Sequence, residues 1–315
     1  MYIGIDLGGT NIAAALVDES GVIVERASIP TDKSGGAKSV TAGLFSVCEE
    51  LTRGKSAPRS IGIGIPGTVN DKTGEIVFTP NLPIGGVNIA APMREKFGCE
   101  IHLDNDANCA ALGEVVAGGA KGARDVVFIT LGTGVGGGIL IGGNLYSGIN
   151  GAAGELGHMV IIAGGRDCGC GRKGCWERYA SASGLNRTAV EFMRTHEESS
   201  LWELCGGDFD MINGKIVFDA YRANDAAARL IVDRYVEHLA IGVVNLINIF
   251  SPELFCVGGG ISSAWDCISG PLQTAVDAEK YTRFSTHSPQ TLITKAQLGN
   301  DAGIIGAAML GSLKG

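Results

Sequence analysis

The stretch YIGIDLGGT, residues 2–10, has the same pattern of apolar and Gly/Thr residues as VVFITLGTG, residues 126–134. The matching positions are separated by a constant offset along the chain. Both stretches begin as an apolar run typical of a buried strand and end in a turn of Gly and Thr. A second apolar run follows each turn, Ile12–Val17 in the first half and Val135–Ile141 in the second, which indicates antiparallel strand pairs. The same arrangement in both halves indicates an internal repeat.

A second correspondence follows later in each half. In the first half, a helical pattern at about residues 40–51 precedes the buried strand Ser60–Ile65. In the second half, a helical pattern at about residues 226–248 precedes the strand Leu254–Val257. Two correspondences in the same order predict an α/β fold of two duplicated lobes with a cleft between them, and clefts between lobes are preferred ligand sites.

The size and composition of the chain agree with two lobes. Its 315 residues exceed the roughly 250–300 residues at which a single hydrophobic core stops growing. Hydrophobic residues make up 45% and charged residues 18%, which excludes a mainly disordered chain. We place a small lobe at residues 1–112, together with a C-terminal helix at about residues 301–315, and a large lobe at residues 113–300.

The net charge and the lengths of the apolar stretches limit which classes of molecule the protein is expected to bind. The net charge is −8 and no Lys/Arg-rich stretch stands out, so we expect no nucleic acid partner. The N-terminus begins on a strand, without a basic segment or a cleavage site, and the apolar stretches are too short for a bilayer. We therefore expect a cytoplasmic protein that binds small solutes and no membrane.

Glycine-rich turns expose backbone N–H groups, which bind phosphate oxygens. An ordinary hairpin turn is the alternative for either turn taken singly, but two at matched positions favour one triphosphate ligand. Asp6 ends a strand and is the expected partner of Mg²⁺, through water. The residues expected to contact the nucleotide are Asp6, Gly8, Gly9, Thr10 and Asn11 in the first turn, Gly132, Thr133 and Gly134 in the second, and Gly258, Gly259 and Gly260 against the adenosine.

Three of the nine cysteines are close together in the sequence. Cys168, Cys170 and Cys175 follow His158 with the spacing H-x9-C-x-C-x4-C, and glycines stand between the cysteines where tight turns are needed. Three thiolates and one imidazole make a closed tetrahedral Zn²⁺ site, which is typical of a structural metal. The alternative is three unrelated buried thiols. The ring nitrogen of His158 that does not bind the metal is left for a further hydrogen bond.

Several acidic side chains are candidates for the chemistry. Asp104 and Asp106 lie between a strand and a helical pattern, and either could accept a proton from a hydroxyl group or cap the helix. Glu155 lies three residues before His158, and Glu177 follows just after Cys175. Carboxylates and an imidazole gathered in this way can bind the hydroxyl groups of a sugar.

Eight motifs of the chain together resemble the ROK family of sugar kinases and repressors, within the actin-like, hexokinase-like superfamily of duplicated ribonuclease-H-type lobes. They extend over nearly the whole sequence: GIDLGGTN, PGTVN, TPNLP, LDNDANCAALGE, TLGTGVGGGI, GINGAAGELGH, CGCGRKGCWERYAS and VGGG. Taken together, these motifs are most similar to those of bacterial glucokinases. Asn11 stands where many relatives have lysine.

The resemblance implies a role for particular residues. Asp106 would be the catalytic base, and Zn²⁺ would be held by His158 and the three cysteines. The residues implied in sugar binding are Asn105, Glu155, His158, Glu177, Gly67 and Asn81.

The expected activity is the phosphorylation of glucose by ATP and Mg²⁺, and a homodimer, possibly a dimer of dimers, is implied. N-acetylmannosamine, N-acetylglucosamine, allose and fructose remain alternative substrates, and polyphosphate remains an alternative donor. A catalytically inactive sugar sensor is the rival class. Repressors of the family carry a helix-turn-helix domain ahead of the first glycine-rich strand. This sequence begins at that strand, and its zinc and catalytic motifs are intact, so we expect a kinase.

Overall fold

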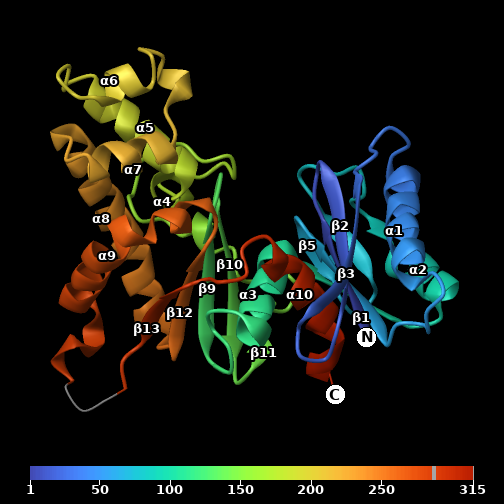
Figure 1. Ribbon diagram of the computed structural model, residues 1–315. Helices are drawn as coiled ribbons and strands as arrows, with labels where there is room; N and C mark the ends of the chain where they lie inside the picture. The colour runs from blue at the N-terminus through green and yellow to red at the C-terminus, as the bar shows by residue number, and fades with distance from the viewer. Residues whose placement is uncertain (286–288, 315) are drawn as a thin grey trace. The chain divides into compact units, whose positions relative to one another are not determined.

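The computed structural model describes residues 1–285 and 289–314 (Figure 1). Residue 315, the end of the predicted C-terminal helix, lies outside them. The chain forms two compact units. Unit 1 comprises Met1–Phe128, Gly137–Gly154 and Ala296–Gly315, and unit 2 comprises Ile129–Gly136 and Glu155–Lys295.

This division differs from the predicted boundary at residue 112. Residues 137–154 belong with unit 1 because they pack directly on a helix of that unit. A Cβ atom on Gly138 would lie 2.6 Å from the Cβ of Ala111. The C-terminal segment also belongs to unit 1, although it lies nearly the whole chain away from the first strand.

Unit 1 contains a five-stranded sheet of order β3-β2-β1-β4-β8. Strands β1 and β2 are antiparallel, as the sequence predicts, and β3 is antiparallel to β2, whereas β1, β4 and β8 run parallel to one another. The strands are β1 (Tyr2–Leu7), β2 (Asn11–Val17), β3 (Ile23–Pro30), β4 (Ser60–Ile65) and β8 (Glu100–Asn105). A small sheet of order β5-β6-β7 consists of β5 (Thr68–Asn70), β6 (Glu75–Phe78) and β7 (Val87–Asn88).

The two faces of this sheet are covered differently. Ile3, Ile5 and Leu7 of β1 are fully buried in one hydrophobic cluster with Leu44 of helix α1 (Ala37–Thr52). The alternate residue Gly4 faces the other way, because side chains alternate along a strand. A Cβ atom on Gly4 would lie 1.9 Å from the carbonyl oxygen of Ile304, so the missing side chain lets a helix rest on the strand backbone.

That helix is α10 (Asp301–Met309), which lies beside α3 (Asp106–Ala117) in Figure 1. The connection that leads into α10 is fixed by Glu114, a fully buried residue of α3. The Glu114 carboxylate accepts the backbone N–H groups of Gly119, Gln297 and Leu298 at 2.7–3.1 Å. The remaining helix of unit 1 is α2 (Ala90–Phe97).

A second five-stranded sheet has the order β11-β10-β9-β12-β13. Its strands are β9 (Val126–Leu131), β10 (Val135–Ile141), β11 (Asn144–Leu145), β12 (Leu254–Gly258) and β13 (Leu292–Lys295). The division between the units falls within β9 and β10. The two sheets repeat the hairpin that the sequence predicts, and the α/β fold class is confirmed.

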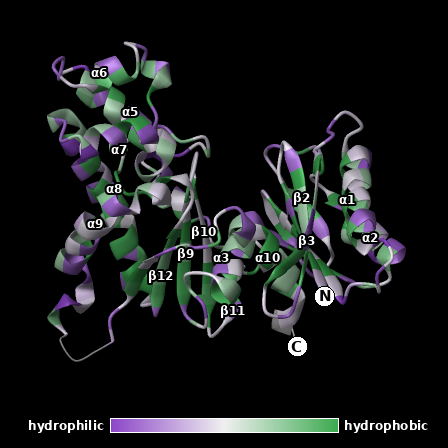
Figure 2. Cartoon of the chain, in the orientation of Figure 1, coloured by the Kyte–Doolittle hydropathy of each residue, from purple (hydrophilic) through white to green (hydrophobic). Residues whose placement is uncertain are grey.

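The helices of unit 2 include one that the sequence predicts well. The pattern at residues 226–248 forms α8 (Ala226–Phe250), which begins after Asp225, whose side chain accepts the N–H of Ala228. The other helices are α4 (Glu177–Ala180), α5 (Ala182–Met193), α6 (Leu201–Leu204), α7 (Gly214–Arg222) and α9 (Trp265–Glu279). Figure 2 shows apolar residues along β9 and β12 and mixed polar and apolar residues along these helices. No helix among the described residues has the length and hydropathy needed to cross a membrane.

Candidate active site

Aspartates lie at one edge of the parallel part of the sheet in unit 1, at the carboxyl ends of β1 and β8 and at the start of α3. Asp6 on β1 pairs with Gly64 on β4, and Gly64 pairs with Asp104 on β8. Asp106 begins α3 directly after β8. A Cβ atom on Gly64 would lie 3.3 Å from Sγ of Cys109 and 3.6 Å from the Cα of Asp106, so the start of α3 packs directly on this strand. The strand-to-helix junction that the sequence predicts therefore places three carboxylates at one edge of the sheet.

The helix start distinguishes the roles of Asp104, Asn105 and Asp106. Asn105 is the N-cap, since its Oδ1 accepts the N–H groups of Ala107 and Asn108 at 2.8 and 3.3 Å. The carboxylate of Asp104 accepts the side-chain N–H of Asn108 at 2.7 Å, which holds it against the first turn of α3. Asp106 lies in the first turn and accepts the N–H of Ala107 at 2.8 Å. The main capping role thus falls on Asn105, and Asp104 has a structural partner.

The negative charges at this edge of the sheet affect the pKa of the neighbouring Cys109 thiol. Burial raises the pKa of Cys109 well above its ordinary value, and the nearby carboxylates of Asp104, Asp106 and Asp6 raise it further. Burial also raises the pKa of Asp6 itself, because a charged carboxylate loses hydration there. A bound cation would restore the stability of that charge, so the carboxylate set fits Mg²⁺ chemically.

The first glycine-rich turn lies beside two of the predicted pocket residues. The N–H of Gly8 donates to the carbonyl oxygen of Asn11 at 2.9 Å, which closes the turn. A Cβ atom on Gly9 would lie 3.7 Å from the Cβ of Asn81. The side-chain N–H of Asn105 donates to the carbonyl oxygen of Gly67 at 3.1 Å. Unit 1 therefore brings Gly9 close to Asn81, and Gly67 close to Asn105.

The second turn belongs to unit 2 and borders a cavity. The N–H of Gly132 donates to the carbonyl oxygen of Gly134 at 3.1 Å, and Gly259 has a φ of +82° and packs against Leu131. Gly258 ends β12. The cavity has a volume of about 580 Å³, and Gly132, Thr133 and Gly260 are among its lining residues.

Sequence reasoning did not find the other wall of this cavity, which α7 and the residue before it supply. The lining residues there are Asn213, Gly214, Lys215, Phe218, Asp219 and Arg222. Lys215 pairs with Asp219 at 2.6 Å, and Arg222 binds both oxygens of Asp266 at 2.9 Å. The spacing of these charges predicts a helix surface, but it does not say which face of the helix borders a cavity.

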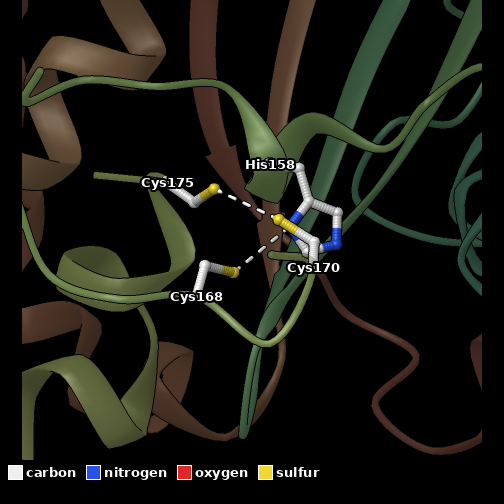
Figure 3. Close-up of side chains that lie close together, drawn as sticks. All are labelled: His158, Cys168, Cys170 and Cys175. Atoms are coloured by element: carbon white, nitrogen blue, oxygen red, sulfur yellow. Dashed lines mark hydrogen bonds between the residues drawn. The ribbon is translucent and has the colours of Figure 1, made fainter. Parts of the chain in front are cut away.

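Figure 3 shows the side chains of His158, Cys168, Cys170 and Cys175 converging on one point. Their ligand atoms all lie within 4.8 Å of one another. The Sγ atoms of Cys170 and Cys175 are 3.6 Å apart, and Nδ1 of His158 is 3.6 Å from Sγ of Cys168. Zn–S and Zn–N bonds of tetrahedral geometry would separate such atoms by roughly 3.5–3.8 Å, so the cluster fits Zn²⁺.

The cluster of His158 and the three cysteines is joined to the core of unit 2 through the residue after Cys175. Trp176 is fully buried, and its ring lies against α8 where Gly242 has no side chain. The indole N–H donates to the carbonyl oxygen of His238 at 2.9 Å. This anchor holds the loop that carries the cysteines against the longest helix of the unit.

Two predicted sugar-binding carboxylates lie around His158. Oε2 of Glu155 is 3.9 Å from Nε2 of His158, and Oε1 of Glu177 is 3.8 Å from Nδ1. Glu177 also accepts a hydrogen bond from the Cys168 thiol at 3.0 Å. Its other oxygen would lie 2.6 Å from a Cβ atom on Gly134, so Glu177 connects the Cys/His cluster with the second turn.

Comparison with known proteins identifies the family. The profile of the ROK family matches residues 2–313. The chain belongs to the ROK family. This ROK protein is 38% identical over 317 residues to a glucokinase of Halalkalibacterium halodurans, covering 98% of this chain and 94% of the relative. It is 36% identical over 310 residues to a glucokinase of Thermotoga maritima, covering 98% and 96%.

A solved structure agrees with the fold of this ROK protein. A ROK family glucokinase from Streptomyces griseus, crystallised with glucose and AMPPNP, has a TM-score of 0.80 and 35% sequence identity. The match covers 98% of each chain. The membership predicted from the eight motifs is thereby confirmed, and the similarity extends over both units.

Proposed function

We propose that this ROK protein is a glucokinase, which transfers the γ-phosphoryl group of ATP to the 6-hydroxyl group of glucose. The observation that carries the proposal is the set of aspartates at the carboxyl ends of β1 and β8 and at the start of α3, beside the turn Gly8–Asn11. The glucokinases of H. halodurans and T. maritima, which match nearly the whole chain, support the choice of sugar.

In the proposed reaction, the oxygen of the sugar 6-hydroxyl group attacks the γ-phosphorus, and Asp106 accepts the proton that this hydroxyl group loses. Asn105 fixes the start of α3 and so the position of Asp106, because its side chain caps the helix and also binds Gly67. Mg²⁺ neutralises phosphate charge when bound, and Asp6 is the residue that would hold it through water. Backbone N–H groups of the two glycine-rich turns bind the phosphate oxygens.

The remaining proposed contacts are those to the adenosine and to the sugar. We assign the adenosine to the cavity lined by Gly260 and α7, whose mainly apolar wall includes Ile261 and Phe218. Glu155 and Glu177 accept hydrogen bonds from sugar hydroxyl groups, and His158 donates one to a sugar oxygen, with Gly67 and Asn81 as further lining. His158 would bind Zn²⁺ through Nδ1, which faces Cys168, and this leaves Nε2 for the sugar.

The test of the proposal is sugar-dependent release of ADP by the purified protein. Glucose, mannose, fructose, allose, N-acetylglucosamine and N-acetylmannosamine are compared by kcat/KM, with inorganic polyphosphate as a second donor. A clear preference for glucose with ATP is the expected result. Preference for an acetamido sugar would keep the mechanism and change the substrate, and no activity with any sugar would contradict the kinase proposal in favour of a sensor. We also propose a homodimer, which light scattering tests directly.

A further inference from the structure

A lysine that none of the sequence motifs includes lies over the first glycine-rich turn. Nζ of Lys33 would be 3.8 Å from a Cβ atom on Gly9, so the ammonium group stands where the glycine leaves the turn open. The same Nζ donates to the carbonyl oxygen of Asn81 at 3.5 Å. Lys33 therefore lies between the turn that binds phosphate in our proposal and a predicted residue of the sugar pocket.

The loop that carries Lys33 is fastened to this turn by its neighbour. The N–H of Thr31 donates to the carbonyl oxygen of Thr10 at 2.9 Å, and its hydroxyl group donates to the carbonyl oxygen of Gly8 at 2.7 Å. Directly after Lys33, the N–H and hydroxyl of Ser34 both donate to Oδ1 of Asp32 at 2.9 and 2.7 Å. These bonds on both sides of Lys33 set the path of the backbone that presents it.

The ammonium group of Lys33 has no ion-pair partner in the part of the chain that the structure describes. Within residues 1–285 and 289–314, no carboxylate lies within ion-pair distance of its ammonium group. The side chain is exposed, so the ammonium group can move a short way on its flexible stem to meet a ligand. Asn11, the residue that closes the turn, is neutral and donates its side-chain N–H to Ser28. Lys33 thus supplies a positive charge at a turn whose own residues carry none.

We propose that Lys33 binds the terminal phosphate of the nucleoside triphosphate and stabilises its charge during transfer. This inference rests on the proposed kinase function. In the step, a bond forms between the sugar oxygen and the γ-phosphorus, and the bond from that phosphorus to the β,γ-bridging oxygen breaks. The bridging oxygen leaves with the bonding electrons, the hydroxyl proton goes to Asp106, and Lys33 keeps all its protons. A fixed positive charge beside the transferring group stabilises the transition state more than the ground state.

The test compares Lys33→Met with Lys33→Arg and with Lys38→Met. Lys38 is an exposed lysine in the first turn of α1, close in the chain and outside the turn, so it is a matched control. We expect Lys33→Met to lower kcat/KM for ATP by roughly 10- to 100-fold, with a fall in kcat. Lys33→Arg should retain a large part of the activity, since the charge remains, and Lys38→Met should match the parent protein.

Binding experiments separate this inference from the proposed function. Calorimetry measures the affinity of each variant for AMPPNP and for AMP, which lacks the β and γ phosphates. Lys33→Met should weaken AMPPNP and leave AMP unchanged. Equal losses for both nucleotides, or no loss of kcat/KM, would overturn the assignment. If the parent protein phosphorylates no sugar, the kinase proposal fails, whereas the difference between AMPPNP and AMP still decides the role of Lys33.

Discussion

Asp106 is the side chain on which the proposed chemistry depends most directly. Replacing it by Asn keeps the size of the side chain and the oxygen that accepts the N–H of Ala107, but removes the base. We expect Asp106→Asn to lower kcat by roughly two to four orders of magnitude, the usual effect of a positioned general base. Steady-state kinetics with glucose and ATP measure this loss.

Glucose affinity is the companion measurement for Asp106→Asn. Calorimetry should give a dissociation constant close to that of the parent protein, because a neutral side chain can still bind a hydroxyl group. Asp210→Asn, at an exposed aspartate, controls for the change of charge. Unchanged kcat in Asp106→Asn would refute the assignment of the base, and Asp104 would then be the next candidate.

At the scale of elements, the loop with the three cysteines is expected to depend on its metal. Burial raises the pKa of Cys168 to about 12, so without a metal this thiol stays protonated. The loop then lacks the metal–ligand bonds that would hold its four side chains together. We expect about one zinc per chain, and Cys170→Ser should lower the zinc content and the temperature of unfolding. The KM for glucose should rise, because His158, Glu155 and Glu177 are held by this loop.

Elemental analysis and thermal unfolding check the metal prediction. Cys99→Ser is the control, since Cys99 is only partly buried and lies outside the cluster. A metal-free protein with full activity and unchanged unfolding temperature would contradict the zinc assignment and support three separate thiols.

The success of sequence reasoning at this scale depends on how local the signal is. The ligands His158 to Cys175 lie within one short segment, so their spacing alone predicts the cluster that Figure 3 shows. The strand Ser60–Ile65 is found because an apolar run ends at a turn signal. Lys33 and the α7 wall of the cavity were missed, because their positions depend on how a loop or a helix face packs in three dimensions.

At the scale of the whole molecule, unit 1 is assembled from three separate segments, and the end of the chain completes its core. The sequence indicated that the C-terminal helix returns to the first lobe, but not how closely it packs. Gly62 on β4 shows how closely α10 packs on the sheet, because a Cβ atom there would lie 1.8 Å from the carbonyl oxygen of Ala307 on α10. A contact this short requires the helix to move away from the sheet.

We therefore expect Gly62→Ala to lower the free energy of unfolding by about 3 kcal/mol, the upper range for overpacking a core. Gly270→Ala is the matched control, because Gly270 lies in α9 and an added Cβ would meet no heavy atom within 4 Å beyond its chain neighbours and the backbone of its own helix. That change should alter the free energy of unfolding by less than about 1 kcal/mol, since the helix preference of alanine is opposed by Pro271, whose ring disfavours a Cβ on the helical residue before it. Denaturant unfolding of both variants measures the two effects. Equal stability of Gly62→Ala and the parent protein would mean that α10 does not rest on the backbone of β4, and that the last residues of the chain are not needed to complete the core of its first unit.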